Sequence, residues 1–177
     1  MQCGAGAVGR PARSTVGGVS DEDRISASRR IAAPASTIFG IITDPAGQVA
    51  IDGSHMMVTA PVAARLEAVG DSFTIDMDRE ALGDFPLGKY QVVNTVTRYE
   101  TDRVLEWNVG SVERGVIGHV YGYELAPTDD GGTDVTSYCD WSAISDAWRE
   151  RLRWPIVPKM ALITTLEKLD ALASRWG

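Results

Sequence analysis

The chain has 177 residues, 44% of them hydrophobic and 23% charged, which suits one domain with a sizeable core. Its net charge of −7 argues against nucleic acid as a partner, because phosphate binding needs a basic surface. No apolar run approaches the ~18 residues of a membrane span, so we expect no stable membrane insertion.

Cysteine and histidine are scarce. The two cysteines, Cys3 and Cys139, are far apart in the sequence, and so are His55 and His119. No spacing among them is typical of a zinc site, so we expect neither a metal nor a cofactor. Two isolated cysteines make no disulfide framework, which favours a cytoplasmic location.

The N-terminal part contains two kinds of segment. Residues 1–22 are rich in small residues and arginine without a hydrophobic block, and we interpret them as a disordered tail before a domain at 23–177. Residues 24–32 alternate in the manner of a first strand. Pro34 then suits the first turn of a helix, which Asp44-Pro45 should end. A short second helix is predicted up to the turn at Asp52-Gly53-Ser54.

The middle of the chain favours strands in close succession from Val58 onward. Phe73, Ile75 and Met77 alternate with polar residues, as in a half-buried strand. The segment 80–89 contains glycine and proline and reads as a loop. The strand segments that follow Val58 are predicted at 63–69, 73–77, 90–100, 104–109, 117–125 and 133–142.

The last predicted element is a long helix within residues 155–176. Its apolar residues recur every three or four positions, at Leu162, Leu166, Leu169, Ala173 and Trp176. A face this broad must be covered by something large. A strand, one or two short helices, a meander of strands and a long helix indicate an α+β fold, whose curved antiparallel sheet of six or seven strands can wrap around the terminal helix.

Several short motifs, taken in their order along the chain, point to a known family. They are Pro34-Ala35 before Ile38-Phe39, Leu105-Glu106-Trp107, residues 123–127 and 131–135, Asp52-Gly53-Ser54, residues 94–97, and Asp140-Trp141-Ser142. Together they resemble the START-like (SRPBCC) superfamily, in an actinobacterial-looking branch. This superfamily includes polyketide cyclase and dehydrase proteins and lipid-transfer domains. The resemblance implies a helix-grip fold with a cavity for apolar ligands, and it covers residues 24–176, but it supplies no shared catalytic set.

Strand alternation nominates the residues that would line such a cavity. Bulky side chains at 117, 119, 121, 123 and 125 share one face of a strand, while glycines at 118 and 122 lie on the other. We expect Asp52 and His55 at the cavity mouth. The expected ligand-binding residues are Phe73, Ile75, Met77, Trp107, His119, Tyr121, Tyr123, Trp141, Leu162 and Leu166.

Three functions are compatible with these patterns. The first is binding of a small, mostly apolar ligand, such as a lipid or polyketide-like molecule. The second is a cyclase or dehydratase in which His119 and Tyr121 act as acid and base, which would need Asp76, Asp140 or Tyr90 within reach. The third is an interaction protein of toxin or stress type, whose protein partner would bind the arginine- and tryptophan-rich segment from Trp148 to Trp154. The lack of a catalytic motif favours the first.

Overall fold

The computed structural model describes residues 21–62, 64–84, 86–111, 113 and 115–175. Within these ranges the strands form a seven-stranded antiparallel sheet in the order β1-β7-β6-β5-β4-β3-β2. Apart from the first strand, which pairs with the last, sequence neighbours pair in turn as a meander. The strands are β1 Arg24–Ile31, β2 Met57–Val62, β3 Ser72–Asp78, β4 Lys89–Glu100, β5 Val104–Ser111, β6 Gly115–Pro127 and β7 Thr133–Asp140.

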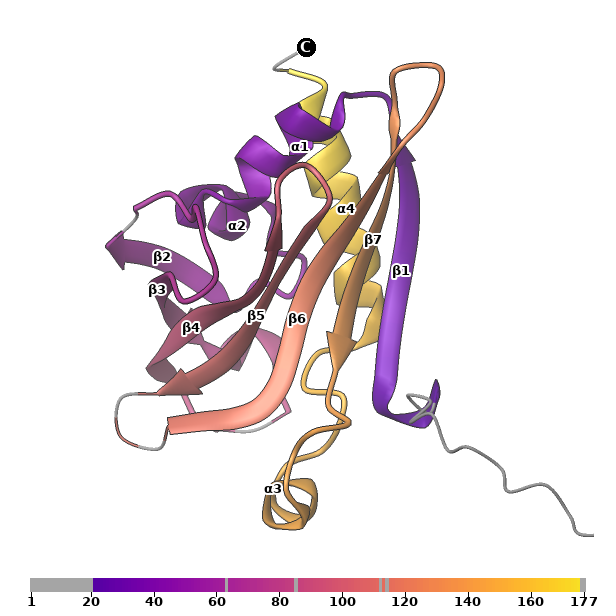
Figure 1. The fold of residues 1–177 in the computed structure, drawn as a ribbon. Helices are drawn as coiled ribbons and strands as arrows, with labels where there is room; N and C mark the ends of the chain where they lie inside the picture. Colours follow the sequence, from indigo (N-terminus) through magenta and orange to yellow (C-terminus); the bar gives the residue numbers. More distant parts are fainter. Residues whose placement is uncertain (1–20, 63, 85, 112, 114, 176–177) are drawn as a thin grey trace, which may run out of the picture.

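The helices confirm the α+β helix-grip fold. The sheet curves around the long terminal helix, and the two short helices that follow β1 lie on the same side of it (Figure 1). A third short helix lies beyond the end of β7 (Figure 1). The elements are α1 Ala35–Ile42, α2 Pro45–Ile51, α3 Asp146–Arg151 and α4 Lys159–Ala173, with 3-10 turns η1 Asp21–Asp23 and η2 Arg79–Leu82.

The core lies between the sheet and α4. The predicted apolar stripe of this helix is buried at Leu162, Leu166, Leu169 and Ala173, whereas Trp176 lies outside the described residues. Burying a leucine fully stabilises the fold by about 1.5–3 kcal/mol, so the stripe fixes α4 against the sheet. The helix begins after Pro158, whose extended backbone (ψ 153°) separates it from residues 155–157.

The short helices begin and end where the sequence predicts. Pro34 is extended at the start of α1. The Asp44 carboxylate caps α2 by accepting a hydrogen bond from the Ala46 amide at 2.9 Å, and Pro45 occupies the first turn, where no amide donor is needed. These caps fix the direction in which α2 leads to the turn at residues 52–54.

Two segments differ from expectation. Residues 64–70 are not a strand: the Leu66 amide donates to the Thr43 carbonyl at 2.9 Å, which ties this segment to the end of α1 instead of to a neighbouring strand. The disordered tail was expected at 1–22. Residues 1–20 lie outside the described part, and residues 21–23 form η1, whose Asp23 binds Arg149 through two hydrogen bonds of 2.8 and 3.0 Å.

The packing on the outward face of the sheet explains why position 122 is a glycine. A Cβ on Gly122 would lie 2.5 Å from the ring of Tyr138, so this position has room for hydrogen only. Tyr138 is 1% exposed although it faces outward, because the Arg24 guanidinium lies 4.0 Å above its ring and its hydroxyl donates to Glu106 at 2.8 Å. The glycine therefore seats an aromatic ring on the outer face.

Candidate functional site

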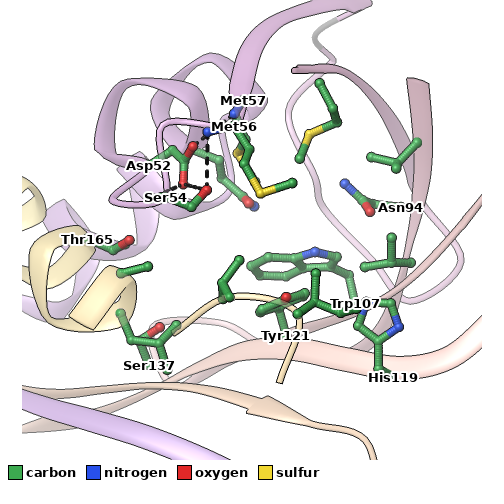
Figure 2. A pocket seen from close by; sticks show the side chains of 18 of the residues that line it. Asp52, Ser54, Met56, Met57, Asn94, Trp107, His119, Tyr121, Ser137 and Thr165 are labelled. Atoms are coloured by element: carbon green, nitrogen blue, oxygen red, sulfur yellow. Dashed lines mark hydrogen bonds between the residues drawn. The ribbon is translucent and has the colours of Figure 1, made fainter. Parts of the chain in front are cut away.

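An inner cavity of about 120 Å³ lies between the sheet and α4 (Figure 2). Side chains from the sheet, from α2 and the turn after it, from α4 and from the segment before α4 enclose it. Its lining residues are Gln48, Asp52, Ser54, Met56, Met57, Met77, Tyr90, Val92, Asn94, Trp107, Val109, His119, Tyr121, Gly122, Tyr123, Ser137, Ile156, Val157, Ala161, Leu162 and Thr165.

Aromatic rings form one wall of this cavity. The ring of Trp107 lies 6.3 Å from that of Tyr121 in a stacked arrangement and 5.9 Å from that of Tyr123. Trp107 is on β5 and the tyrosines alternate along β6, so strand register places the three rings together. Burial raises the pKa of both tyrosines, that of Tyr121 well above its usual value, so both hydroxyls stay protonated.

A turn that follows α2 provides the polar residues at one end of the cavity. Asp52 accepts hydrogen bonds from the Ser54 amide at 2.9 Å, from its hydroxyl at 2.7 Å and from the Met57 amide at 2.9 Å. The Gly53 amide donates to Thr165 Oγ1 of α4 at 3.0 Å. The Asp52 carboxylate thus already has three donors from its own turn, which leaves it mainly a structural role.

His119 and Asn94 lie at the other end (Figure 2). They are 3% and 2% exposed, and within the described part of the chain neither His119 Nδ1 nor Asn94 Oδ1 has a hydrogen-bond partner. Burial lowers the pKa of His119 to about 4, so the imidazole is neutral at pH 7. Its ring makes T-shaped contacts with the rings of Tyr121 and Trp154, at centroid distances of 5.6 and 5.0 Å.

A larger outer hollow of about 480 Å³ adjoins the inner cavity at this end. Trp148 and Leu152, in and just after α3, form one side of it, and Arg79 and Leu87 lie on another. The two hollows have five lining residues in common, which we call the neck: Tyr90, Val92, Val109, His119 and Ile156. The two hollows are therefore neighbours that meet at the neck.

The expected ligand-binding residues fall into three groups. Six of them line the inner cavity: Met77, Trp107, His119, Tyr121, Tyr123 and Leu162. Three, Phe73, Ile75 and Leu166, are buried in the core and line neither hollow. The last, Trp141, packs beside the neck, where its ring stacks on that of Trp154 at 6.1 Å.

Of the two residues expected at the cavity mouth, one lines the inner cavity and the other does not. Asp52 lines the inner cavity at the end opposite His119, while His55 is exposed and lines neither hollow. His55 has a positive φ of 59°, so it serves the turn that leads into β2.

Two of the three partners proposed for an acid–base role of His119 are engaged elsewhere. Asp76 accepts a hydrogen bond from Gln91 at 2.9 Å, and Asp140 binds the amide and hydroxyl of Ser142. Tyr90 does lie in the neck with His119. Of the proposed partners, the structure therefore brings Tyr90 alone to the same site as His119.

Several polar lining residues were not found from the sequence. Asn94 carried a usable signal, because it is a lone amide between Val92 and Val96 on the inward face of β4. Thr165 and Gln48 gave none, since a single polar residue on a helix is ordinarily solvent-facing. The Gln48 amide instead donates to the Ile42 carbonyl at 2.9 Å, which holds it inside.

Comparison with known proteins identifies the family. Residues 22–175 match the model of the polyketide cyclase / dehydrase and lipid transport family, which covers most of the chain. The chain belongs to this family. The fold of this family is the START-like helix grip anticipated from the sequence.

Individual relatives agree with this placement. The uncharacterized protein Rv0088 of Mycobacterium tuberculosis is 29% identical over 121 residues, which are 68% of this chain. The match spans about half (48%) of that relative's length.

Solved structures support the fold. Protein Ms6760 from Mycobacterium smegmatis superposes with a TM-score of 0.58 at 19% identity, over 89% of this chain and 94% of that one. An AHSA1-like protein from Aeromonas hydrophila gives a TM-score of 0.55 at 16% identity, over 87% and 94% of the two chains. In the described part of the chain, no helix is both long and apolar enough to cross a bilayer.

Proposed function

We propose that this protein binds a small, mostly apolar ligand in the inner cavity. The observation that carries the proposal is the cavity itself, which has three adjacent aromatic rings in one wall and polar atoms at each end. Pockets with an apolar wall and a few fixed polar groups are the usual sites for small molecules. Membership of a family that includes lipid transport proteins supports the same function.

The size of the cavity limits what it can hold. An engineered cavity of about 150 Å³ in another protein accommodates benzene, so a cavity of 120 Å³ suits about one ring. A larger ligand would place one ring between Trp107 and α4 and extend past the neck. The outer hollow, about 480 Å³, has room for such an extension.

The electrostatics support binding over acid–base catalysis. An efficient general acid or base has a pKa near the working pH. The pKa of His119 is lowered to about 4 and that of Tyr121 is raised well above its usual value, so neither group is poised to exchange a proton at pH 7. The cyclase or dehydratase alternative therefore receives less support from the site than ligand binding does.

The arginine- and tryptophan-rich segment also supports ligand binding more than it supports a protein partner. Trp148 lines the outer hollow and Trp154 packs on His119, so both tryptophans belong to the surroundings of the proposed site. Arg149 is engaged by Asp23. A cytoplasmic location is part of the proposal, because the buried Cys139 is a free thiol, as is common in reducing compartments.

A cavity-filling substitution tests the proposal. Ala161 lines the cavity from α4, so Ala161→Phe should fill it, whereas Ala171→Phe adds the same ring at an exposed position of the same helix. We expect the unaltered protein and Ala171→Phe to bind the neutral fluorescent probe N-phenyl-1-naphthylamine saturably, and Ala161→Phe to bind it at least about tenfold more weakly. Circular dichroism would verify that both variants fold.

Native mass spectrometry of the protein purified from its own host would identify a resident ligand. A defined metabolite near one copy per chain, absent from Ala161→Phe, is the expected result. Equal probe binding by all three proteins, together with an empty native protein, would overturn the proposal.

A further inference from the structure

Two buried polar atoms at one end of the inner cavity have no partner in the described part of the chain: Asn94 Oδ1 and His119 Nδ1. Both side chains are at least 97% buried and both line the cavity. Buried polar atoms in folded proteins are almost always hydrogen-bonded, so an orphaned pair in a cavity points to a missing partner. Asn108 Oδ1 is also unpartnered, but Asn108 lines neither hollow.

The sheet sets the spacing of the two atoms. Asn94 on β4 pairs with Val109 on β5, and His119 lies on β6, the next strand. Two strand spacings separate the backbones of β4 and β6 by about 10 Å. Figure 2 shows both side chains at the end of the cavity opposite Asp52. This backbone separation leaves room for one ring to present a different polar group to each residue.

The chemistry of the two atoms selects the ligand group. An amide oxygen only accepts hydrogen bonds, so Asn94 Oδ1 requires a donor. A neutral imidazole has one donor and one acceptor nitrogen, and Nδ1 is either one, depending on the tautomer. A hydroxyl both donates and accepts, so it satisfies Asn94 Oδ1 and either tautomer of His119. An ether or a ketone cannot donate, and would leave Asn94 Oδ1 unpaired.

We infer that the ligand is an uncharged ring compound with two hydroxyl groups, one bound by Asn94 Oδ1 and the other by His119 Nδ1. Asn94 and His119 then determine specificity for hydroxylated rings over their alkylated analogues. This inference rests on the proposed function, since it names the ligand class for the same cavity.

The remaining lining residues disfavour charged ligands. The described side chains that line the inner cavity include no lysine or arginine, so a buried carboxylate would lack a counter-charge. Asp52 is the acidic residue among them, and its oxygens already accept three hydrogen bonds from its own turn. A buried ammonium group would therefore compete with bonds that hold the turn together.

A series of single-ring probes tests the inference by isothermal titration calorimetry. The probes are resorcinol, its dimethyl ether 1,3-dimethoxybenzene, benzoate and benzylamine. We expect resorcinol to bind at least about tenfold more tightly than the other three, which corresponds to about 1.4 kcal/mol. This series needs only the unaltered protein, so it is decisive even if a variant does not fold.

Variants assign the discrimination to the two residues. Asn94→Leu and His119→Phe each remove one hydrogen-bonding group while keeping approximate shape, and each should reduce the preference for resorcinol over its ether by at least about threefold. The double variant should show no preference. Asn108→Leu is the matched control: it removes a third amide oxygen that is buried without a partner in the described part of the chain, at a position that lines neither hollow, and it should keep the full preference.

The outcomes separate this inference from the proposed function. If the ether binds as tightly as resorcinol, or if benzoate or benzylamine binds best, the cavity binds ligands but the inferred hydroxyl specificity is wrong. If Asn94→Leu and His119→Phe keep the full preference, the assignment to these residues is wrong. If no probe binds saturably and N-phenyl-1-naphthylamine does not bind either, the proposed function fails and the inference fails with it.

Discussion

The contact between the turn at residues 52–54 and α4 is close enough to predict the effect of a single methyl group. A Cβ on Gly53 would lie 2.2 Å from the Ala161 carbonyl oxygen and 2.5 Å from the Thr165 amide nitrogen. Both are backbone atoms of a packed helix, so neither can rotate away. Gly53→Ala must therefore push the turn away from α4.

Two effects should lower the free energy of unfolding of Gly53→Ala. Overpacking in a well-packed interior costs about 1–3 kcal/mol. Moving the turn also weakens the hydrogen bonds from the Gly53 amide to Thr165 Oγ1, at 3.0 Å, and from Lys168 Nζ to the Asp52 carbonyl, at 2.5 Å, worth about 1 kcal/mol each. We expect a total loss of about 3 kcal/mol, and thus a Tm lower by roughly 6–12 °C for a domain of this size.

Thermal and urea unfolding followed by circular dichroism would measure this loss. Gly40→Ala is the matched control: Gly40 lies inside α1, and the nearest atom to its added Cβ is 4.0 Å away, at the end of Arg65. That variant should be stabilised by about 0.5–1 kcal/mol, because alanine favours a helix interior. A Gly53→Ala protein within 0.5 kcal/mol of the unaltered protein would show that the turn does not rest on α4 as described.

Three further predictions concern the neck, the outer hollow and the outer face of the sheet. The folded-state pKa of His119 (about 4) is below its unfolded value near 6.5, so between these pH values the unfolded chain binds more protons than the folded protein. The contribution of His119 to the free energy of unfolding is therefore complete above pH 6.5, and up to about 3 kcal/mol of it is lost as the pH falls to about 4. Urea unfolding from pH 4 to 7 should show this loss relative to His119→Phe, and parallel pH profiles for the two proteins would refute it. Trp148→Ala should weaken binding of N-phenyl-1-naphthylamine several-fold without changing the affinity for resorcinol, because Trp148 lines the outer hollow but not the inner cavity. Equal losses of affinity for both probes in titrations would contradict the arrangement of two adjacent hollows. Tyr138→Phe removes a 2.8 Å hydrogen bond to the Glu106 carboxylate and should lower the free energy of unfolding by about 2 kcal/mol, and an unchanged urea midpoint would mean that the bond is not made in solution.

Most of the fold could be predicted because its signals are local. Alternation along β3 and the three-and-four spacing in α4 each depend on a few neighbouring residues. The segment 64–70 could not be assigned in this way, since the Thr43 carbonyl that holds Leu66 belongs to a distant helix end. The burial of Tyr138 was hidden for a similar reason, because Arg24 and Glu106 come from other strands.

The site was predictable in part. The alternation of β6 assigns His119, Tyr121 and Tyr123 to one face of the strand, and all three line the inner cavity, because strand period alone decides which face a residue is on. Phe73 and Ile75 follow the same rule but are covered by other core residues, and alternation cannot distinguish a covered side chain from a cavity wall. The outer hollow lies between α3, β4 and β6, so its existence depends on how distant segments meet.

The inner cavity also affects the response of the protein to pressure. Its 120 Å³ per molecule corresponds to about 70 mL/mol, within the range of volume decreases seen when proteins unfold, which scale with the void eliminated. Hydrostatic pressure favours the state of smaller volume, so the empty protein carries a built-in sensitivity to compression. A ligand that fills the space removes much of that volume difference. The occupied protein should therefore withstand compression that unfolds the empty one.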